Sequence, residues 1–183
     1  AERADTLCVG GAMAYTFLRA LGQPTGASLV ETERVEDAHR LLAAARAAGC
    51  RVLLPVDHVV AERPEAGPSR TVATIPEGWL GVDIGPETAA SYADACARAR
   101  TIFWNGPMGI FEVEAFSAGT RAVAEAVAAS PARSVVGGGD SLAAIHAAGV
   151  ADRITHLSTG GGASLEFVQG LELPGIAALE ARS

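Results

Sequence analysis

Lysine is absent from this chain, and all fourteen of its basic residues are arginine. A phosphate-binding P-loop of the form G-x-x-x-x-G-K-[S/T] is therefore excluded, and so is any Schiff-base lysine. If the protein binds a phosphate group, the phosphate has to be held by backbone amides, helix N-termini, a metal ion or arginine.

Positive charge is scarce as well, since the net charge is −7 and the pI is about 5.1. This balance argues against nucleic acid as a partner, because its backbone requires a basic face. No run of eighteen apolar residues occurs and no signal-peptide pattern opens the chain, so the sequence predicts no membrane span.

Cysteine and aromatic residues are also few. The three cysteines, Cys8, Cys50 and Cys96, are odd in number and far apart, which favours free thiols in a reducing compartment and predicts a cytoplasmic protein. Neither they nor the four histidines show the spacing of a metal site. Because aromatics make up only 5% of the chain, we expect a core built mainly of Ala, Val, Leu and Ile.

What the chain does contain is a regular alternation of strand-like and helix-like segments. With 183 residues, 49% of them hydrophobic, it is long enough for one compact domain. This alternation with short loops predicts an α/β fold in which a parallel sheet is flanked by helices. We expect strands at 4–9, 51–56, 71–75, 101–104, 134–136 and 154–157, and helices at 12–21, 35–48, 87–98, 115–129, 141–148, 163–169 and 173–179.

Three glycine-rich segments each follow a predicted strand. They are NGPMG at 105–109, GGGDS at 137–141 and STGGGAS at 158–164. Glycine and proline at this density end a strand and allow backbone to approach a ligand closely. Because carboxyl ends of parallel strands meet at one edge of a sheet, these segments predict a phosphate-bearing ligand at that edge.

Seven segments that span essentially the whole chain carry a wider pattern. They are LCVGGAMAYTFL (7–18), LLPVDHVVA (53–61), GWLGVDIGP (78–86), IFWNGPMGIFE (102–112), VVGGGDS (135–141), HLSTGGGASLEF (156–167) and ELPGIAAL (172–179). In these segments, and in their order, the chain resembles the C-terminal, nucleotide-binding half of phosphoglycerate kinase. The resemblance implies a three-layer αβα Rossmann-like domain. Residues 1–183 would be one partial domain that lacks its first strand, a Gly-Gly-Ala-Lys loop and the N-terminal 3-phosphoglycerate lobe.

The resemblance also implies a role for individual residues. Glu112 would bind the ribose hydroxyls, and Asp140 would reach a Mg²⁺ ion. The nucleotide phosphates would be held by Gly138, Gly139, Asp140 and Ser141. The remaining nucleoside contacts would come from Gly10, Gly11, Gly81 and Val82 as a slot for adenine, with Asn105 and Pro107 at its border.

For the third cluster the resemblance implies a catalytic role. The amides of Gly160, Gly161 and Gly162 would face the migrating phosphoryl group, which suits a reaction that depends on positioning and charge stabilisation. The expected function is that of the MgADP- and MgATP-binding lobe in phosphoryl transfer between 1,3-bisphosphoglycerate and ADP. The intact enzyme is expected to be a monomer and this chain alone to be inactive.

Three alternatives remain open from the sequence. Gly139–Leu142 spells the GDSL motif of a serine hydrolase family, although Asp152 and His156 are one residue too far apart for that family's D-x-x-H pair. A dinucleotide-binding oxidoreductase is a weaker alternative, because no glycine cluster completes G-x-G-x-x-G/A. The third is a partial domain that associates with its missing half through an unpaired sheet edge and the apolar tail around Ile176 and Leu179.

Overall fold

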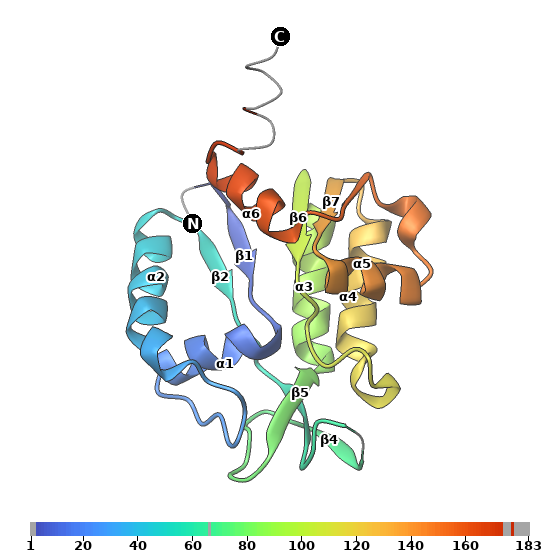
Figure 1. Ribbon diagram of the computed structural model, residues 1–183. Coiled ribbons are helices and arrows are strands. Elements are labelled where there is room, and N and C mark those ends of the chain that lie inside the picture. The colour runs from blue at the N-terminus through green and yellow to red at the C-terminus, as the bar shows by residue number, and fades with distance from the viewer. Residues whose placement is uncertain (1–2, 66, 174–176, 178–183) are drawn as a thin grey trace.

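The computed structural model describes residues 3–65, 67–173 and 177 (Figure 1). The expected tail helix at 173–179, with Ile176 and Leu179, lies almost entirely outside the described residues. In chain order the strands and α-helices are β1 (Thr6–Cys8), α1 (Gly11–Ala20), α2 (Val35–Ala47), β2 (Arg51–Leu53), β3 (His58–Ala61), β4 (Ser69–Val72), β5 (Leu80–Ile84), α3 (Pro86–Arg98), β6 (Thr101–Asn105), α4 (Ala118–Ala129), β7 (Arg133–Gly137), α5 (Gly139–Ala147), β8 (His156–Ser158) and α6 (Gly161–Gln169).

Two of the three sheets are parallel, which confirms the predicted α/β class. Strands β1 and β2 pair in one parallel sheet, and β6, β7 and β8 follow one another in a second. Helices α3, α4 and α5 accompany the second sheet, and α1 and α2 lie beside the first (Figure 1). In the part of the chain that the structure describes, β1 pairs only with β2 and β6 only with β7, so each has one unpaired edge.

The third sheet differs from the expectation, because it is antiparallel with the order β4-β3-β5. The predicted strand at 51–56 ends at Leu53, ahead of Pro55, and the one expected at 71–75 lies at Ser69–Val72. The connection at 62–68 is too short for the crossover of a dozen or more residues that neighbouring parallel strands require, so β3 and β4 pair by chain reversal. Strand β5 then pairs with the other edge of β3, again antiparallel to it.

Helix α3 connects the two parallel sheets. Tyr92 on this helix is 1% exposed and packs in one buried cluster with Trp104, Val136 and Ile145. Its hydroxyl donates a hydrogen bond to the carbonyl oxygen of Val9 at 2.6 Å, just beyond β1. This buried hydrophobic cluster therefore includes residues close to the ends of β6 and β7, from which the glycine-rich loops begin. None of the described helices is both long and apolar enough to cross a membrane.

Buried carboxylates occupy the N-termini of α3 and α4. Asp57 accepts hydrogen bonds from the amides of Glu87 and Thr88, at 3.0 and 2.8 Å, and from the Thr88 hydroxyl at 2.6 Å. Burial opposes the ionisation of Asp57, but these bonds outweigh it and lower its pKa. Asp83 accepts from the Gly119 amide at 2.6 Å, and burial raises its pKa to about 7 despite its amide bonds. Neither helix end is open to an external anion.

His58 gives the fold a predicted pH dependence. It is 3% exposed, its Nδ1 has no partner, and burial lowers its pKa although Asp57 opposes the shift. Folded His58 is neutral while unfolded histidine gains a proton near pH 6.5, so this contribution to stability falls as pH drops from about 7 towards 5. Asp83 has a raised pKa, so its contribution to stability increases as pH drops over the same range, opposite to that of His58.

We expect His58→Phe to remove the histidine contribution, so that the variant loses less stability on acidification than the unsubstituted chain. The measurement is urea unfolding at pH 7, 6 and 5, which separates His58 from Asp83 because Asp83 is present in both proteins. His39→Phe, at an exposed histidine, serves as the control and should leave the pH slope in place. Equal slopes for all three proteins would contradict the prediction.

Candidate functional site

The loops that follow β6, β7 and β8 meet at the carboxyl edge of their sheet. The Asn105 side-chain amide donates to the carbonyl oxygen of Gly137 at 2.8 Å, which ties the first loop to the second. The Gly138 amide donates to the carbonyl oxygen of Ser158 at 3.2 Å, which ties the second to the third. A methyl group at Gly161 would lie only 3.0 Å from the Gly138 Cα. The sequence-predicted residues of all three clusters are thus brought together.

Two helices begin at this meeting point with glycine as the N-cap. Gly138 precedes α5 and Gly160 precedes α6, and neither helix has a side-chain hydrogen bond from its cap residue. The first amides of a helix have no intrahelical partner and carry the positive end of its dipole. Unlike α3 and α4, whose N-termini hold Asp57 and Asp83, α5 and α6 offer their amides to a ligand. This arrangement suits an anion with several oxygens, such as a phosphate chain.

Ser141 is buried within this arrangement rather than lining its surface. It is 1% exposed, and its hydroxyl oxygen accepts a hydrogen bond from the Gly106 amide at 2.6 Å. A serine nucleophile has to reach its substrate, so the geometry argues against the GDSL hydrolase alternative. The bond to Gly106 holds the β6 loop against α5.

The residues expected to form the adenine slot come from three segments that pack closely. The Gly11 amide donates to the carbonyl oxygen of Met108 at 2.9 Å, and a methyl group at Gly10 would lie 2.4 Å from the Met108 sulfur. The Ile110 amide donates to the carbonyl oxygen of Val82 at 2.8 Å. Val82 is itself 1% exposed. The segments 10–11, 81–82 and 105–110 therefore form one unit.

The structure explains several of these glycines by close packing. A methyl group at Gly11 would lie 2.9 Å from the carbonyl oxygen of Pro107, and one at Gly81 would lie 2.2 Å from the Tyr15 hydroxyl. Gly109, which the sequence-based site does not include, approaches the carbonyl oxygen of Val82 so closely that a methyl group would be at 2.4 Å. Its position in the NGPMG segment is the sequence signal that could have identified it.

Glu112, in the loop after β6, and Asp140, at the start of α5, are exposed carboxylates. Glu112 lines a cavity of about 180 Å³ together with Phe111, Ser117, Thr120 and Arg121. Asp140 lies in the first turn of α5, beside the open amides. The described residues include no group of three or more His, Cys, Asp or Glu side chains that could hold a metal. A Mg²⁺ ion at Asp140 would take its other oxygens from a bound phosphate chain and water, as this ion commonly does.

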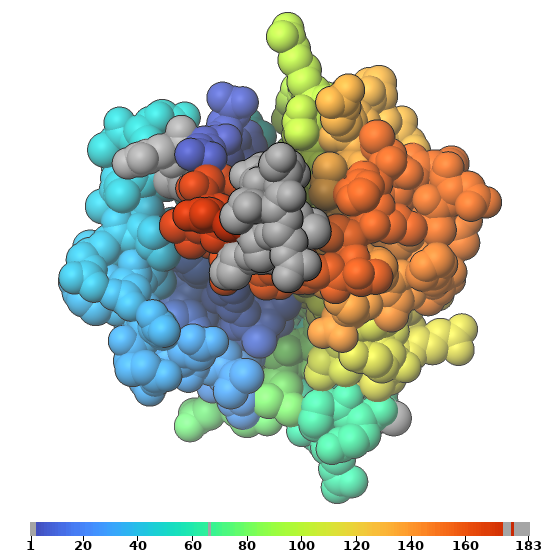
Figure 2. Space-filling view, turned by 45° about the horizontal axis from the view of Figure 1, so that its top comes forward, coloured from blue at the N-terminus to red at the C-terminus, as the bar shows by residue number. Residues whose placement is uncertain are grey.

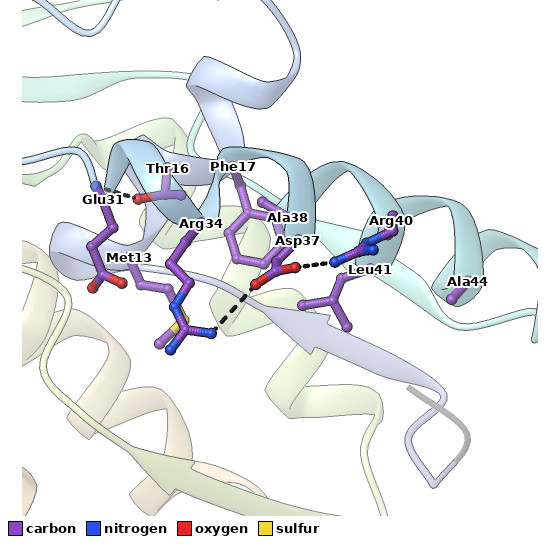
Figure 3. A pocket seen from close by; sticks show the side chains of 10 residues that line it. All are labelled: Met13, Thr16, Phe17, Glu31, Arg34, Asp37, Ala38, Arg40, Leu41 and Ala44. Carbon is purple, nitrogen blue, oxygen red and sulfur yellow. Dashed lines mark hydrogen bonds and ion pairs between the residues drawn. The ribbon is translucent and has the colours of Figure 1, made fainter.

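A larger cavity, of about 530 Å³, lies between α1 and α2 and contains none of the predicted site residues (Figure 3). Three of its polar side chains pair with one another, since Asp37 accepts hydrogen bonds from Arg34, at 3.3 Å, and from Arg40. Thr16 lies in its wall and accepts a hydrogen bond from the Glu31 amide at 3.1 Å.

A family model described as phosphoglycerate kinase matches residues 1–171. The chain belongs to the phosphoglycerate kinase family. It is 60% identical over 177 residues to the phosphoglycerate kinase of Solibacter usitatus, covering 96% of this chain and 44% of that protein. It is 58% identical over 182 residues to that of Rubrobacter xylanophilus, covering 98% and 46%.

Solved structures of the family have the same fold. The phosphoglycerate kinase structure from Coxiella burnetii superimposes with a TM-score of 0.92 at 45% identity, over 97% of this chain and 46% of that one. The structure from Pyrococcus horikoshii gives a TM-score of 0.77 at 38% identity, over 98% and 46%. The chain therefore spans about half the length of the phosphoglycerate kinases it matches.

Within this phosphoglycerate kinase domain, Gly138 and Gly139 form a matched pair for substitution. Gly138 has a φ of +94°, and a methyl group there would lie 3.2 Å from the Asn105 amide nitrogen, whereas a methyl group at Gly139 meets nothing within 4 Å. We expect Gly138→Ala to lower the free energy of unfolding by about 1–3 kcal/mol, since alanine is strained in this region. Gly139→Ala, by contrast, should be neutral or stabilising by about 0.5 kcal/mol. Urea titration of both variants checks this, and equal losses would contradict it.

Proposed function

We propose that this chain is the MgADP- and MgATP-binding lobe of a phosphoglycerate kinase, the enzyme that transfers a phosphoryl group between 1,3-bisphosphoglycerate and ADP. The observation that carries the proposal is the convergence of two open helix N-termini, those of α5 and α6, at Gly138 and Gly161. That pair of amide clusters matches the requirement of a nucleotide's phosphate chain for several hydrogen-bond donors.

The nucleoside end of the ligand would lie against the packed unit formed by segments 10–11, 81–82 and 105–110. Backbone at Gly10, Gly11 and Gly81 would contact the flat adenine ring, with Val82 buried behind it and Asn105 and Pro107 at the border. Glu112 would accept hydrogen bonds from the ribose hydroxyls, since its carboxylate is exposed beside a cavity. A charge-assisted bond of this kind contributes about 1.5–3 kcal/mol.

The phosphate end would be held by Gly138, Gly139 and the α5 amides. The Ser141 hydroxyl would hold the loop after β6 in place through its bond from the Gly106 amide. Asp140 would hold Mg²⁺, which supplies positive charge to the phosphate oxygens. The amides of Gly160, Gly161 and Gly162 would stabilise the charge that the transferred group carries in the transition state. Asn105 keeps the two loops in register through its bond to Gly137.

The second substrate, 3-phosphoglycerate or its acyl phosphate, would be held by the lobe that accounts for the other half of the relatives' length. On this proposal the chain alone binds nucleotide but transfers no phosphoryl group. We further propose that the intact enzyme acts as a monomer in the cytoplasm without nucleic acid or membrane partners.

Calorimetric titration of the chain with MgADP tests the proposal. We expect saturable 1:1 binding, a roughly 10- to 100-fold weaker Kd for Glu112→Gln from the lost charge-assisted bond, and no binding of NADH. Glu114→Gln, at a neighbouring exposed carboxylate that also lines the cavity, is the matched control and should bind as the unsubstituted chain does. A folded chain that binds NADH but not MgADP would overturn the proposal.

A further inference from the structure

The hydroxyl of Thr120 on α4 contacts the 105–110 segment of the expected nucleoside slot, twelve residues along the chain from Met108. Thr120 lies in the first turn of α4, is 2% exposed, and accepts a hydrogen bond from the Met108 amide at 3.0 Å. Met108 is 6% exposed and lies at the centre of the 105–110 segment. A buried backbone amide has to find an acceptor, and the Thr120 hydroxyl is that acceptor.

Met108 passes this restraint on to the first glycine segment. Its carbonyl oxygen accepts the Gly11 amide at 2.9 Å, and its sulfur lies against Gly10. Both polar groups of one peptide segment are therefore committed, one to α4 and the other to the start of α1. A shift of Met108 would move the walls contributed by Gly10 and Gly11.

The position of Thr120 is itself fixed by the third segment of the slot. Asp83, directly after Val82, accepts the Gly119 amide at 2.6 Å. Gly119 packs so closely on β5 that a methyl group there would lie 2.4 Å from the Ile84 side chain and 2.6 Å from the Asp83 carboxylate. Helix α4 thus cannot move relative to β5 without breaking this contact.

We propose that Thr120 is a positioning residue for nucleoside binding, which latches the 105–110 segment against Gly10 and Gly11 through the Met108 amide. The inference rests on the proposed function and deepens it, because it assigns the geometry of the slot to a buried hydroxyl that is bonded to the Met108 amide. The latch acts at Met108, in the middle of the segment. The start of the same segment is held to β7 and α5 by other bonds, from Asn105 to Gly137 and from Gly106 to Ser141.

The test compares Thr120→Val, which keeps the shape but removes the acceptor, with Thr120→Ser, which keeps the hydroxyl. Adenosine and MgADP affinities are measured by calorimetry for each. We expect Thr120→Val to weaken both ligands at least 5-fold by the same factor, so that the ratio of the two affinities is unchanged. Thr120→Ser should restore both affinities to within 2-fold of the unsubstituted chain.

Thr16→Val is the matched control, since Thr16 is also a buried threonine whose hydroxyl accepts one backbone amide, that of Glu31, and it lies in the wall of the other cavity (Figure 3). It should lose thermal stability as Thr120→Val does, yet bind adenosine within 2-fold of the unsubstituted chain. Equal weakening by both variants would show a general effect of destabilisation and overturn the latch.

Hydrogen exchange on the unsubstituted chain provides a measurement that does not depend on a variant folding. The Met108 and Gly11 amides are expected to exchange at least 100-fold more slowly than unprotected amides, and exchange at the unprotected rate would overturn the proposal. Binding by the unsubstituted chain with no loss in Thr120→Val would reject the latch alone. Failure of the unsubstituted chain to bind either ligand would reject the proposed function and the latch together.

Discussion

Asp57→Ala is expected to lower the free energy of unfolding by at least about 3 kcal/mol, since it removes two or more hydrogen bonds to a buried carboxylate at about 1.5 kcal/mol each. The substitution would leave the amides of Glu87 and Thr88 without their acceptor at the start of α3, which joins the parallel sheets through Tyr92. Chemical denaturation followed by circular dichroism measures the change.

Two comparison variants identify the cause of this loss. Asp57→Asn keeps one carbonyl oxygen as an acceptor, so it should lose clearly less stability than alanine. Asp37→Ala removes a carboxylate whose partners, Arg34 and Arg40, are exposed side chains, and its urea midpoint should stay close to that of the unsubstituted chain. If Asp57→Ala and Asp37→Ala had the same midpoint, the capping role of Asp57 would be refuted.

The second large effect concerns metal-dependent nucleotide binding. We expect Asp140→Asn to weaken ADP binding about 10- to 100-fold in the presence of Mg²⁺, because it removes the proposed protein ligand of the ion. In EDTA the variant and the unsubstituted chain should bind ADP about equally, or the variant slightly better, since a carboxylate next to phosphate is then repulsive. Calorimetric titrations with and without Mg²⁺ give both values.

Asp152→Asn serves as the matched control for that experiment. Asp152 is likewise an exposed aspartate in the first turn of a short helical segment, Ala151–Arg153. That segment comes before β8, at the opposite end of the strand from the glycine-rich loops. It should bind as the unsubstituted chain does in both conditions. A loss at Asp140 of equal size in EDTA would mean that the carboxylate acts on the loop and not on a metal.

Much of the architecture could be predicted from the hydrophobic periodicity of the sequence and from the glycines and prolines between its elements. Helices α1, α2 and α3 begin and end within one or two residues of the predicted limits, because glycine or proline marks at least one end of each. The segment 58–84 could not be read in the same way. Its strands are short, and pairing β3 between β4 and β5 depends on contacts distant in sequence.

Some site residues could likewise be predicted from local sequence, whereas others are placed by contacts between distant elements. Gly138 and Gly161 belong to clusters whose spacing already marks a loop before a helix, so their meeting at one edge follows from the parallel sheet. Thr120 carries no such signal, since a single threonine early in an alanine-rich helix is common. Its contact with Met108 depends on where α4 lies, and α4 is bonded to Asp83 through the Gly119 amide. Ser141 was placed in the right loop, but the sequence could not show that its hydroxyl faces Gly106.

Helix α6 contributes no buried side chain to the fold, and Phe167 on it is 67% exposed (Figure 2 shows this C-terminal region, in red, at the surface). Its large apolar side chains, Leu165, Phe167 and Val168, are each 40% exposed or more, so α6 gains little free energy from burial. On the proposed function, the docked population of α6 would set how often the amides of Gly160–Gly162 face the phosphate chain. If the chain binds nucleotide as proposed, the affinity would scale with that population. Covering Phe167 would then tighten nucleotide binding by shifting this equilibrium, without contact with the nucleotide.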